Sequence, residues 1–335
     1  MSVHYKNRFM ECKEAVYCVI DLTMIIDYLY KGRNERERGV IRTYEDVTPA
    51  VLEVMQRTKE PRLRELLISL VRHLHGFVLD TRLTEEEFRT CADILVRLGQ
   101  QTTDSHNEVI LAAGSLGVSS LVCLLNNGDK GNTETTASLL GPFWRLNSPR
   151  TENGGSIVRS DTPGRPLLMD ARVLDQDGAP IVDGEVDIWH SSPVGLYEQQ
   201  DPEQAEMNLR GKFKTDANGR FWFRSVIPAG YPIPVTGVVG ELLAAQDRHP
   251  FRPAHIHSLI FKPGFKTLIS QIYVNGTDYL DSDVQFGVTQ ALIGSFIRHD
   301  EPDPERDMPD APWFSLNYTY TMGKGEAKLP RPPIK

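Results

Sequence analysis

The sequence predicts an α+β protein in which an N-terminal helical region is followed by an antiparallel β-sandwich. In residues 46–130, apolar side chains recur at intervals of three and four, which is typical of amphipathic helices. From about residue 150 the apolar runs shorten to strand length, and turn-forming Gly and Pro residues separate them, as in β-sandwiches. We therefore divide the chain into an N-terminal extension (1–45), a helical region (46–130) and a sandwich domain (131–335).

The helical region contains start signals and periodic apolar runs in order along the chain. Its first helix is expected at Thr48-Pro49, a capping residue followed by a proline at the first helical position. The second, PRLRELLISLVRHLHGFV from Pro61 to Val78, repeats leucine at helical spacing. The stretch TEEE, Thr84 to Glu87, is a capping box that starts the third. A fourth run, Val109 to Leu125, is expected to break or bend near Gly114 and Gly117.

The sandwich domain alternates short apolar runs with turn signals. It opens with PLLMDARVLDQDGAPIVDGEVDIWH, in which the Asp-Gly pairs at 177–178 and 183–184 mark turns between two strands. Later strands are expected at three apolar runs: 221–226, 255–261 and 268–276. A last mixed segment, about 283–297, is expected to form a late helix, and the proline-rich tail LPRPPIK an extended arm.

The overall charge and the cysteines limit the possible partners. The net charge of −8 argues against a nucleic-acid partner, because phosphate binding requires a basic surface. Asp21 and Asp27 interrupt the apolar run at 15–30, so we expect a helix or strand there and no membrane insertion. The four cysteines form no CxxC pair, which suits a reducing cytoplasm, the expected location. Cys91 and Cys123 lie on apolar helix faces and are expected in the core.

Two histidines and two tyrosines have the pattern of a metal site. In FRPAHIHS, His255 and His257 lie two apart on a strand and therefore face the same side. Taken alone, such a pair is more often a half-buried polar pair than half of a metal site. Tyr231 precedes a proline in AGYPIP and Tyr197 follows a glycine in SSPVGLYEQQDP, so both phenols are presented at strand ends or loop mouths. Two phenolates with two imidazoles would suit Fe(III), a hard ion that tolerates nitrogen.

The segments DIWHSSPVGLYE, IPAGYPIP, FRPAHIH and SQIYVNG, in this order, resemble the intradiol ring-cleavage dioxygenases. These are non-haem Fe(III) enzymes that split catechols between the two hydroxyl-bearing carbons, and the resemblance runs from about residue 48 to residue 297. It implies one ferric ion per chain and four metal ligands: Tyr197, Tyr231, His255 and His257. It further implies that Tyr231 and His257 are axial, and that Tyr231 leaves the iron when substrate arrives and takes up a proton.

The resemblance also assigns roles to residues around the metal. Arg252 is implied to stabilise the negative charge that develops on the ring during oxygen attack. Gln271, on the strand after the histidines, is implied to hydrogen-bond behind the ligands. Further side chains are implied to form the substrate pocket: Leu111, Gly114, Leu140, Gly141, Pro142, Phe143, Ile227, Pro228 and Arg252.

Within the family the chain is most similar to the hydroxyquinol 1,2-dioxygenases, through VGELLAAQDRHPFRPAHIH, RHLHGFV and DSDVQFGVTQALIGSF. This implies that O2 converts hydroxyquinol (1,2,4-trihydroxybenzene) to 3-hydroxy-cis,cis-muconate, a form of maleylacetate. One position departs from the pattern, because Gly114 stands where hydroxyquinol enzymes often carry an acid and catechol enzymes a proline. Catechol and chlorocatechol 1,2-dioxygenase activity, giving cis,cis-muconates, are therefore kept as alternatives.

The resemblance also concerns assembly. It implies a homodimer formed through the helical region, and family members can hold a phospholipid at that interface. A non-catalytic alternative is a transthyretin-like binding sandwich, which the run VLDQDGAPIVDGEVDIWH also resembles. Such a module has no reason to carry the two tyrosines and two histidines together. An extradiol enzyme would need Fe(II) and a carboxylate placed with the two histidines, and the sequence places none there.

Overall fold

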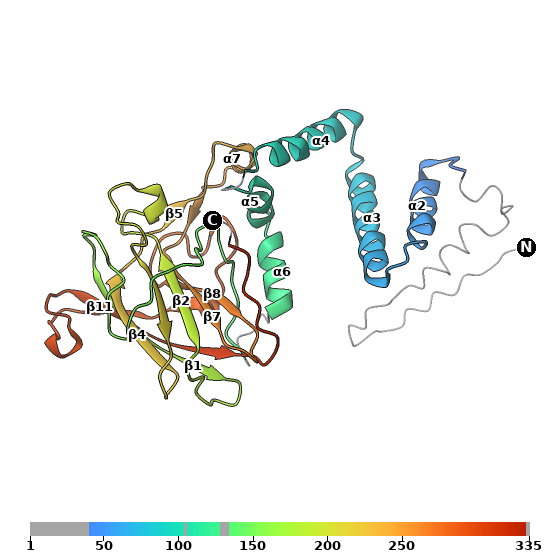
Figure 1. Cartoon of the computed structure of the whole chain (residues 1–335). Coiled ribbons are helices and arrows are strands. Elements are labelled where there is room, and N and C mark those ends of the chain that lie inside the picture. The colour runs from blue at the N-terminus through green and yellow to red at the C-terminus, as the bar shows by residue number, and fades with distance from the viewer. Residues whose placement is uncertain (1–39, 104–105, 128–133, 333–335) are drawn as a thin grey trace, which may run out of the picture. The chain divides into compact units, whose positions relative to one another are not determined.

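The computed structural model describes residues 40–103, 106–127 and 134–332, so the apolar run at 15–30 lies outside the described residues. The chain divides into two compact units, Met1–Cys91 and Ala92–Lys335, which are treated separately below (Figure 1). The predicted boundaries near residues 45 and 130 stay predictions.

The described part of the first unit, from residue 40 onward, is helical. It contains the 3-10 turn η2 (Tyr44–Asp46) and the helices α2 (Val47–Met55), α3 (Pro61–Thr81) and the start of α4 (Glu85–Gln100). The prediction that Thr48 caps the first helix is wrong by two residues. A capping box between Thr43 and Asp46 starts the 3-10 turn, and α2 continues from it. Pro49 is therefore the third residue of α2, still within the first turn, where its missing N–H costs nothing.

Side-chain capping fixes the first residues of the next two helices. The Glu60 carboxylate accepts hydrogen bonds from the first backbone N–H groups of α3. The predicted capping box at the start of α4 is confirmed, because Glu87 N–H donates to the Thr84 hydroxyl at 3.2 Å and Thr84 N–H donates to the Glu87 carboxylate at 2.8 Å. The expectation that Cys91 lies in the core is wrong, since its side chain is exposed on α4.

The second unit begins with short helices. α5 (Glu108–Ser115) and α6 (Val118–Asn127) are bent by 79° relative to one another, which confirms the predicted bend; Gly117, between them, has a φ of +73°. α7 (Val238–Ala245) packs against α5 around a small apolar cluster that includes Ala112 and Val239. In the described ranges no single helix is long and apolar enough to cross a bilayer, and only the bent α5–α6 pair reaches that length together.

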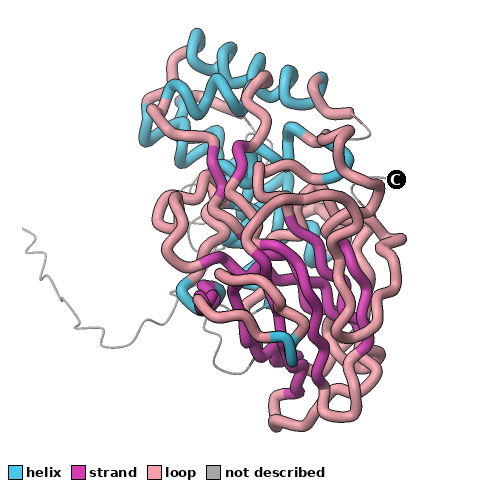
Figure 2. Tube along the Cα trace, turned by 90° about the vertical axis from the view of Figure 1, so that its left-hand side faces the viewer, coloured by secondary structure: helices cyan, strands magenta, loops and turns pink. Residues whose placement is uncertain are grey.

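Two sheets form the body of the second unit, and their strands lie layered in Figure 2. The first sheet has the order β10 (Phe296–His299), β11 (Trp313–Met322), β1 (Pro166–Asp175) and β4 (Arg220–Val226). The second has the order β3 (Arg210–Lys214), β2 (Glu185–His190), β7 (His255–Phe261), β8 (Leu268–Val274) and β9 (Ile293–Gly294). A two-stranded ribbon consists of β5 (Tyr231–Pro232) and β6 (Phe251–Arg252). The predicted α+β class with a sandwich is confirmed, although β1–β11 and β8–β9 pair in parallel.

The sandwich core lies between the inward faces of both sheets. Alternate residues of β1 and β4 are fully buried, as expected for strands that cover one side of a core. The core side chains include Met169, Phe221, Phe223, Ile256 and Ile272, each at most 1% exposed. This rigid double layer positions the ends of β2, β5, β6 and β7, where the candidate side chains lie.

Two parts of the sandwich differ from the sequence prediction. The late helix expected at 283–297 is wrong: this segment is a loop, the short 3-10 turn η4 (Gln290–Leu292), and the strands β9 and β10. The Asp283 carboxylate accepts hydrogen bonds from the N–H groups of Gln285 and Gly287, which folds the start of the segment into turns instead of a helix. The strand β11, missed from the sequence, lies in the middle of its sheet between β10 and β1.

Candidate metal centre

The two predicted histidines and two predicted tyrosines come together in the second unit. His255 Nε2 lies 3.2 Å from His257 Nε2 and 3.4 Å from the Tyr231 hydroxyl. The Tyr231 and Tyr197 rings lie edge to face, with centroids 5.6 Å apart. All four side chains are buried, with at most 7% of any residue exposed. We call these four side chains the tyrosine–histidine centre.

Glycines allow the loops that carry the tyrosines to approach one another. Tyr231 lies opposite Arg252 in the β5–β6 ribbon, and a side chain on Gly230 would come within 2.6 Å of the Arg252 carbonyl oxygen. Gly195 has a φ of +82°, and a side chain there would come within 2.8 Å of the Gly230 carbonyl oxygen. The turn that carries Tyr197 therefore packs directly on the backbone before Tyr231.

The surroundings of the two imidazoles keep them neutral. His255 Nδ1 lies 2.7 Å from the Pro253 carbonyl, which can only accept, so Nδ1 carries the hydrogen and Nε2 keeps its lone pair. The ring of Trp189 stacks on His257 at 4.7 Å between centroids. Burial lowers the pKa of His255 to about 3, and burial together with the neighbouring imidazole lowers the pKa of His257 as well. Both rings can therefore act as nitrogen ligands at neutral pH.

Burial outweighs the nearby positive charge of Arg252 and keeps the two phenols protonated when no metal is bound. Burial raises the pKa of both Tyr197 and Tyr231 above the ordinary value. The Tyr197 hydroxyl is fully buried and has no hydrogen-bond partner within the described residues. Leaving such a group unsatisfied costs about 1–3 kcal/mol. A strongly Lewis-acidic cation bound between the phenol oxygens and the imidazole nitrogens would remove that cost, so the donor set fits a hard metal ion.

Carboxylates do not take part in the centre. Nowhere in the described ranges do three His, Cys, Asp or Glu side chains converge as a metal site would require. The pair of histidines therefore has no carboxylate partner of the kind that the extradiol alternative needs, and the centre depends on its tyrosines.

Arg252 lies beside the centre and is held by a buried network. Its Nε and Nη2 donate to the Asp283 carboxylate at 3.1 and 3.0 Å, and Nη2 also donates to Gln271 Oε1 and to the Tyr273 hydroxyl, both at 2.9 Å. Only Nη1 points to the centre, 3.5 Å from His255 Nε2. Arg252 is 2% exposed, so its charge acts where water does not screen it.

Gln271 connects this network to the wall of the centre. It lies opposite His257 in the β7–β8 ladder, and its Nε2 donates to the Leu139 carbonyl at 2.6 Å. No described hydrogen bond joins Gln271 to the tyrosine–histidine centre itself. Its contacts hold Arg252 and the segment that begins at Leu139 in place, behind the centre.

The segment after Leu139 packs against the tyrosine–histidine centre. Leu140 and Phe143 join the cluster around the two tyrosines, and the Phe143 ring stacks on Tyr197 with centroids 4.3 Å apart. Gly141 has a φ of +74°, and a side chain there would come within 3.1 Å of the His257 ring. Pro142, in contrast, is exposed.

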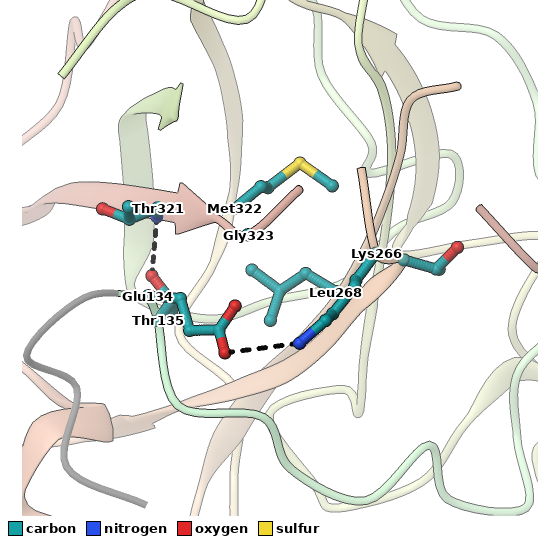
Figure 3. A pocket seen from close by; sticks show the side chains of 8 residues that line it. Glu134, Thr135, Lys266, Leu268, Thr321, Met322 and Gly323 are labelled. Carbon is teal, nitrogen blue, oxygen red and sulfur yellow. Dashed lines mark hydrogen bonds and ion pairs between the residues drawn. The ribbon is translucent and has the colours of Figure 1, made fainter. Parts of the chain in front are cut away.

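Four other predicted pocket residues lie outside the cluster that surrounds the two tyrosines. Leu111 and Gly114 are one turn apart on α5, where Leu111 packs against the cluster that contains Ile233. Ile227 is buried in the sandwich core, and with Pro228 it lines a hollow of about 400 Å³ that no member of the tyrosine–histidine centre lines. A further pocket, around Glu134 and Lys266, holds about 10 Å³, room for a single water (Figure 3).

Comparison with known proteins shows the family of the chain. Residues 139–322 match the family described as dioxygenase, and residues 60–133 match the family described as catechol dioxygenase N terminus. A hydroxyquinol 1,2-dioxygenase from Rhizobium sp. (strain MTP-10005) is 36% identical over 82% of this chain and 93% of its own length. The chain belongs to the intradiol ring-cleavage dioxygenases. This family is iron-dependent, and its members open aromatic diols with O2.

Two further relatives of this intradiol dioxygenase are informative. The catechol 1,2-dioxygenase of Candida albicans is 36% identical over 78% of this chain and 86% of its own length. The crystal structure of a hydroxyquinol 1,2-dioxygenase from Pseudomonas putida DLL-E4 has a TM-score of 0.76 and 34% identity, and the match covers 84% of this chain and all of the other.

Sequence reasoning missed several residues of this dioxygenase site. Asp283, Tyr273 and Trp189 contact Arg252, Gln271 or His257, and none of them was selected from the sequence. Tyr273 lies two residues after Gln271 on one strand face, a signal that could have been used. Asp283 lies far from Arg252 in the chain, and its segment was taken as a helix, so no local pattern indicated the contact.

Proposed function

We propose that this intradiol dioxygenase cleaves hydroxyquinol with O2 on one ferric ion held by the tyrosine–histidine centre. The observation that carries the proposal is the convergence of two buried phenols and two neutral imidazoles, with the Tyr197 hydroxyl left without a partner in the described residues. When bound, Fe(III) acts as a Lewis acid that draws electron density from a chelated catecholate and makes the ring reactive toward O2.

The residues of the chain prepare the substrate for this chemistry. Tyr231 is proposed to take up one of the two protons that a diol loses on binding. Burial raises the pKa of the Tyr231 phenol, so a phenolate set free at this position would accept a proton readily. Nη1 of Arg252 is directed at the centre, and its positive charge would stabilise negative charge on the ring in this dry site. The stacked Phe143 and the turn at Gly141 would form the apolar wall.

Hydroxyquinol is the first candidate substrate, because a hydroxyquinol 1,2-dioxygenase structure has 34% identity and a TM-score of 0.76 to this chain, against 26% and 0.68 for a chlorocatechol 1,2-dioxygenase structure. Catechol is the second, because the Candida albicans catechol enzyme is as identical to this chain as the Rhizobium hydroxyquinol enzyme. Gly114 offers no side chain to a third hydroxyl. We therefore expect hydroxyquinol to be preferred and catechol to be cleaved measurably.

Oxygen uptake by the iron-loaded protein tests the proposal, with hydroxyquinol, catechol, chlorocatechols and protocatechuate offered separately. Stoichiometric oxygen consumption and a muconate-type product are expected with hydroxyquinol. A catechol kcat/KM tenfold or more above that for hydroxyquinol would reassign the substrate. No uptake with any diol by protein that holds one ferric ion per chain would refute the function.

We also infer a homodimer formed through the helical region. Apolar side chains along α3 are about half exposed, which leaves an apolar stripe for a second copy to cover: Leu63, Leu66, Leu70, Leu74 and Phe77. Sedimentation equilibrium should give twice the chain mass, and Leu66→Glu with Leu70→Glu should give the monomer. A phospholipid at the same interface would appear in organic extracts of the purified dimer and be absent from extracts of the double variant.

A further inference from the structure

Gly114 leaves a space on α5 that another residue of the chain fills. A side chain built on Gly114 would come within 3.1–3.2 Å of the Gln285 carboxamide, at its carbon, its nitrogen and its oxygen. The amide group of Gln285 therefore lies against the bare backbone of α5. Any larger residue at 114 would have to push it away.

The loop that carries Gln285 is anchored at both ends on Arg252. Asp283 forms the buried ion pair with Arg252, and a side chain on Gly287 would come within 2.7 Å of Arg252 Nη2. Between these anchors, the Ser120 hydroxyl donates to the Gln285 carbonyl at 2.8 Å. The same contacts that hold Arg252 at the tyrosine–histidine centre thus fix the backbone of Gln285 between Arg252 and Ser120 of α6.

The carboxamide of Gln285 remains available for a ligand. Its side-chain oxygen and nitrogen have no hydrogen-bond partner among the described residues, although the residue is half-buried. A carboxamide offers two donors and an acceptor, and can therefore bond a phenolic hydroxyl in either direction. Leu111, one turn before Gly114 on the same face of α5, gives this position an apolar neighbour.

We propose that the Gln285 carboxamide, seated on Gly114, hydrogen-bonds the third hydroxyl of the substrate and sets the preference for hydroxyquinol over catechol. This inference rests on the proposed function. It makes Gly114 and Gln285 a complementary pair, in which the glycine provides the space and the glutamine provides the polar group. A site that bonds a substrate hydroxyl discriminates against the analogue that lacks it, whereas an empty space does not.

Gln285→Leu tests the role directly, because leucine keeps the bulk and removes the hydrogen bonds. The kcat/KM ratio of hydroxyquinol to catechol should fall about tenfold, the effect of one lost hydrogen bond, with catechol kcat/KM little changed. Gln285→Glu should restore part of the ratio, because a carboxylate can still accept from the hydroxyl. Gln290→Leu, an exposed glutamine five residues on, is the matched control and should leave the ratio unchanged.

A binding measurement separates recognition from turnover. Anaerobic titration with each diol, followed by visible absorption of the iron-loaded protein, should show weaker hydroxyquinol binding and unchanged catechol binding in Gln285→Leu. Gly114→Ala should reproduce part of this shift, because its methyl group would lie within 3.1–3.2 Å of the carboxamide and move it by a few tenths of an ångström. Equal changes for both diols, or none, would overturn the role of Gln285 while leaving the function standing. A parent enzyme that cleaves neither diol would refute the function, and this inference with it.

Discussion

Removal of the Asp283 carboxylate should strongly destabilise the second unit. The carboxylate lies within 3.1 Å of two guanidinium nitrogens of Arg252 and accepts two backbone hydrogen bonds, and both side chains are at most 3% exposed. Asp283→Ala would leave the Arg252 charge buried without its partner. Breaking a buried ion pair in this way costs about 3–5 kcal/mol.

Thermal unfolding measures this loss. For a unit of this size, about 4 kcal/mol corresponds to a melting temperature lowered by roughly 8–16 °C. Asp283→Asn, which keeps the shape and one acceptor oxygen, should lose roughly half as much. The control is Asp300→Ala, which removes the partner of Arg298 in an exposed ion pair (71% and 59% exposed) and should not change the melting temperature measurably.

The same variant should affect turnover, because Nη1 of Arg252 is aimed at the centre only while its other nitrogens are held. Asp283→Asn is therefore expected to lower kcat more than it raises KM, at equal iron content. The reasoning is refuted if the free energy of unfolding of Asp283→Ala lies within about 1 kcal/mol of the parent value, since leaving a buried guanidinium unpaired costs more than this.

Four further outcomes are expected. His257→Ala should lose iron and visible colour together; stoichiometric iron in that variant would exclude the proposed ligand set. Tyr231→Phe should keep some iron and turn over more slowly, and unchanged turnover at every pH would show that Tyr231 is not the base. Gly141→Ala should destabilise the fold by roughly 1–2 kcal/mol in chemical denaturation, because its φ is positive and its methyl group would meet His257. Burial raises the pKa of Asp187 to about 6, above the unfolded value of about 3.9. The free energy of unfolding should therefore fall by at most about 3 kcal/mol as the pH rises from 4 to 6. In Asp187→Asn this pH dependence should be absent.

Local patterns in the sequence were sufficient for the fold class and for selecting the two tyrosines and two histidines that the structure brings together. The i, i+2 spacing of His255 and His257 fixes their common face on any strand, and the proline after Tyr231 fixes an extended backbone there. Capping residues set the start of α4, and the glycines near 114–117 set the bend between α5 and α6. These features depend on neighbours within a few residues, so they can be predicted from the sequence without knowledge of the tertiary structure.

Only the tertiary structure decided which distant segments complete the site. The loop at 283–287 reads as a helix by its apolar spacing, but the Asp283 carboxylate binds its own backbone and the buried charge of Arg252 instead. The contact between Gly114 and Gln285 joins positions far apart in the chain. The types of the two residues do not predict that they lie together. Desolvation is the physical reason, because a buried guanidinium must find a carboxylate wherever the fold brings one, and local propensity yields to that requirement.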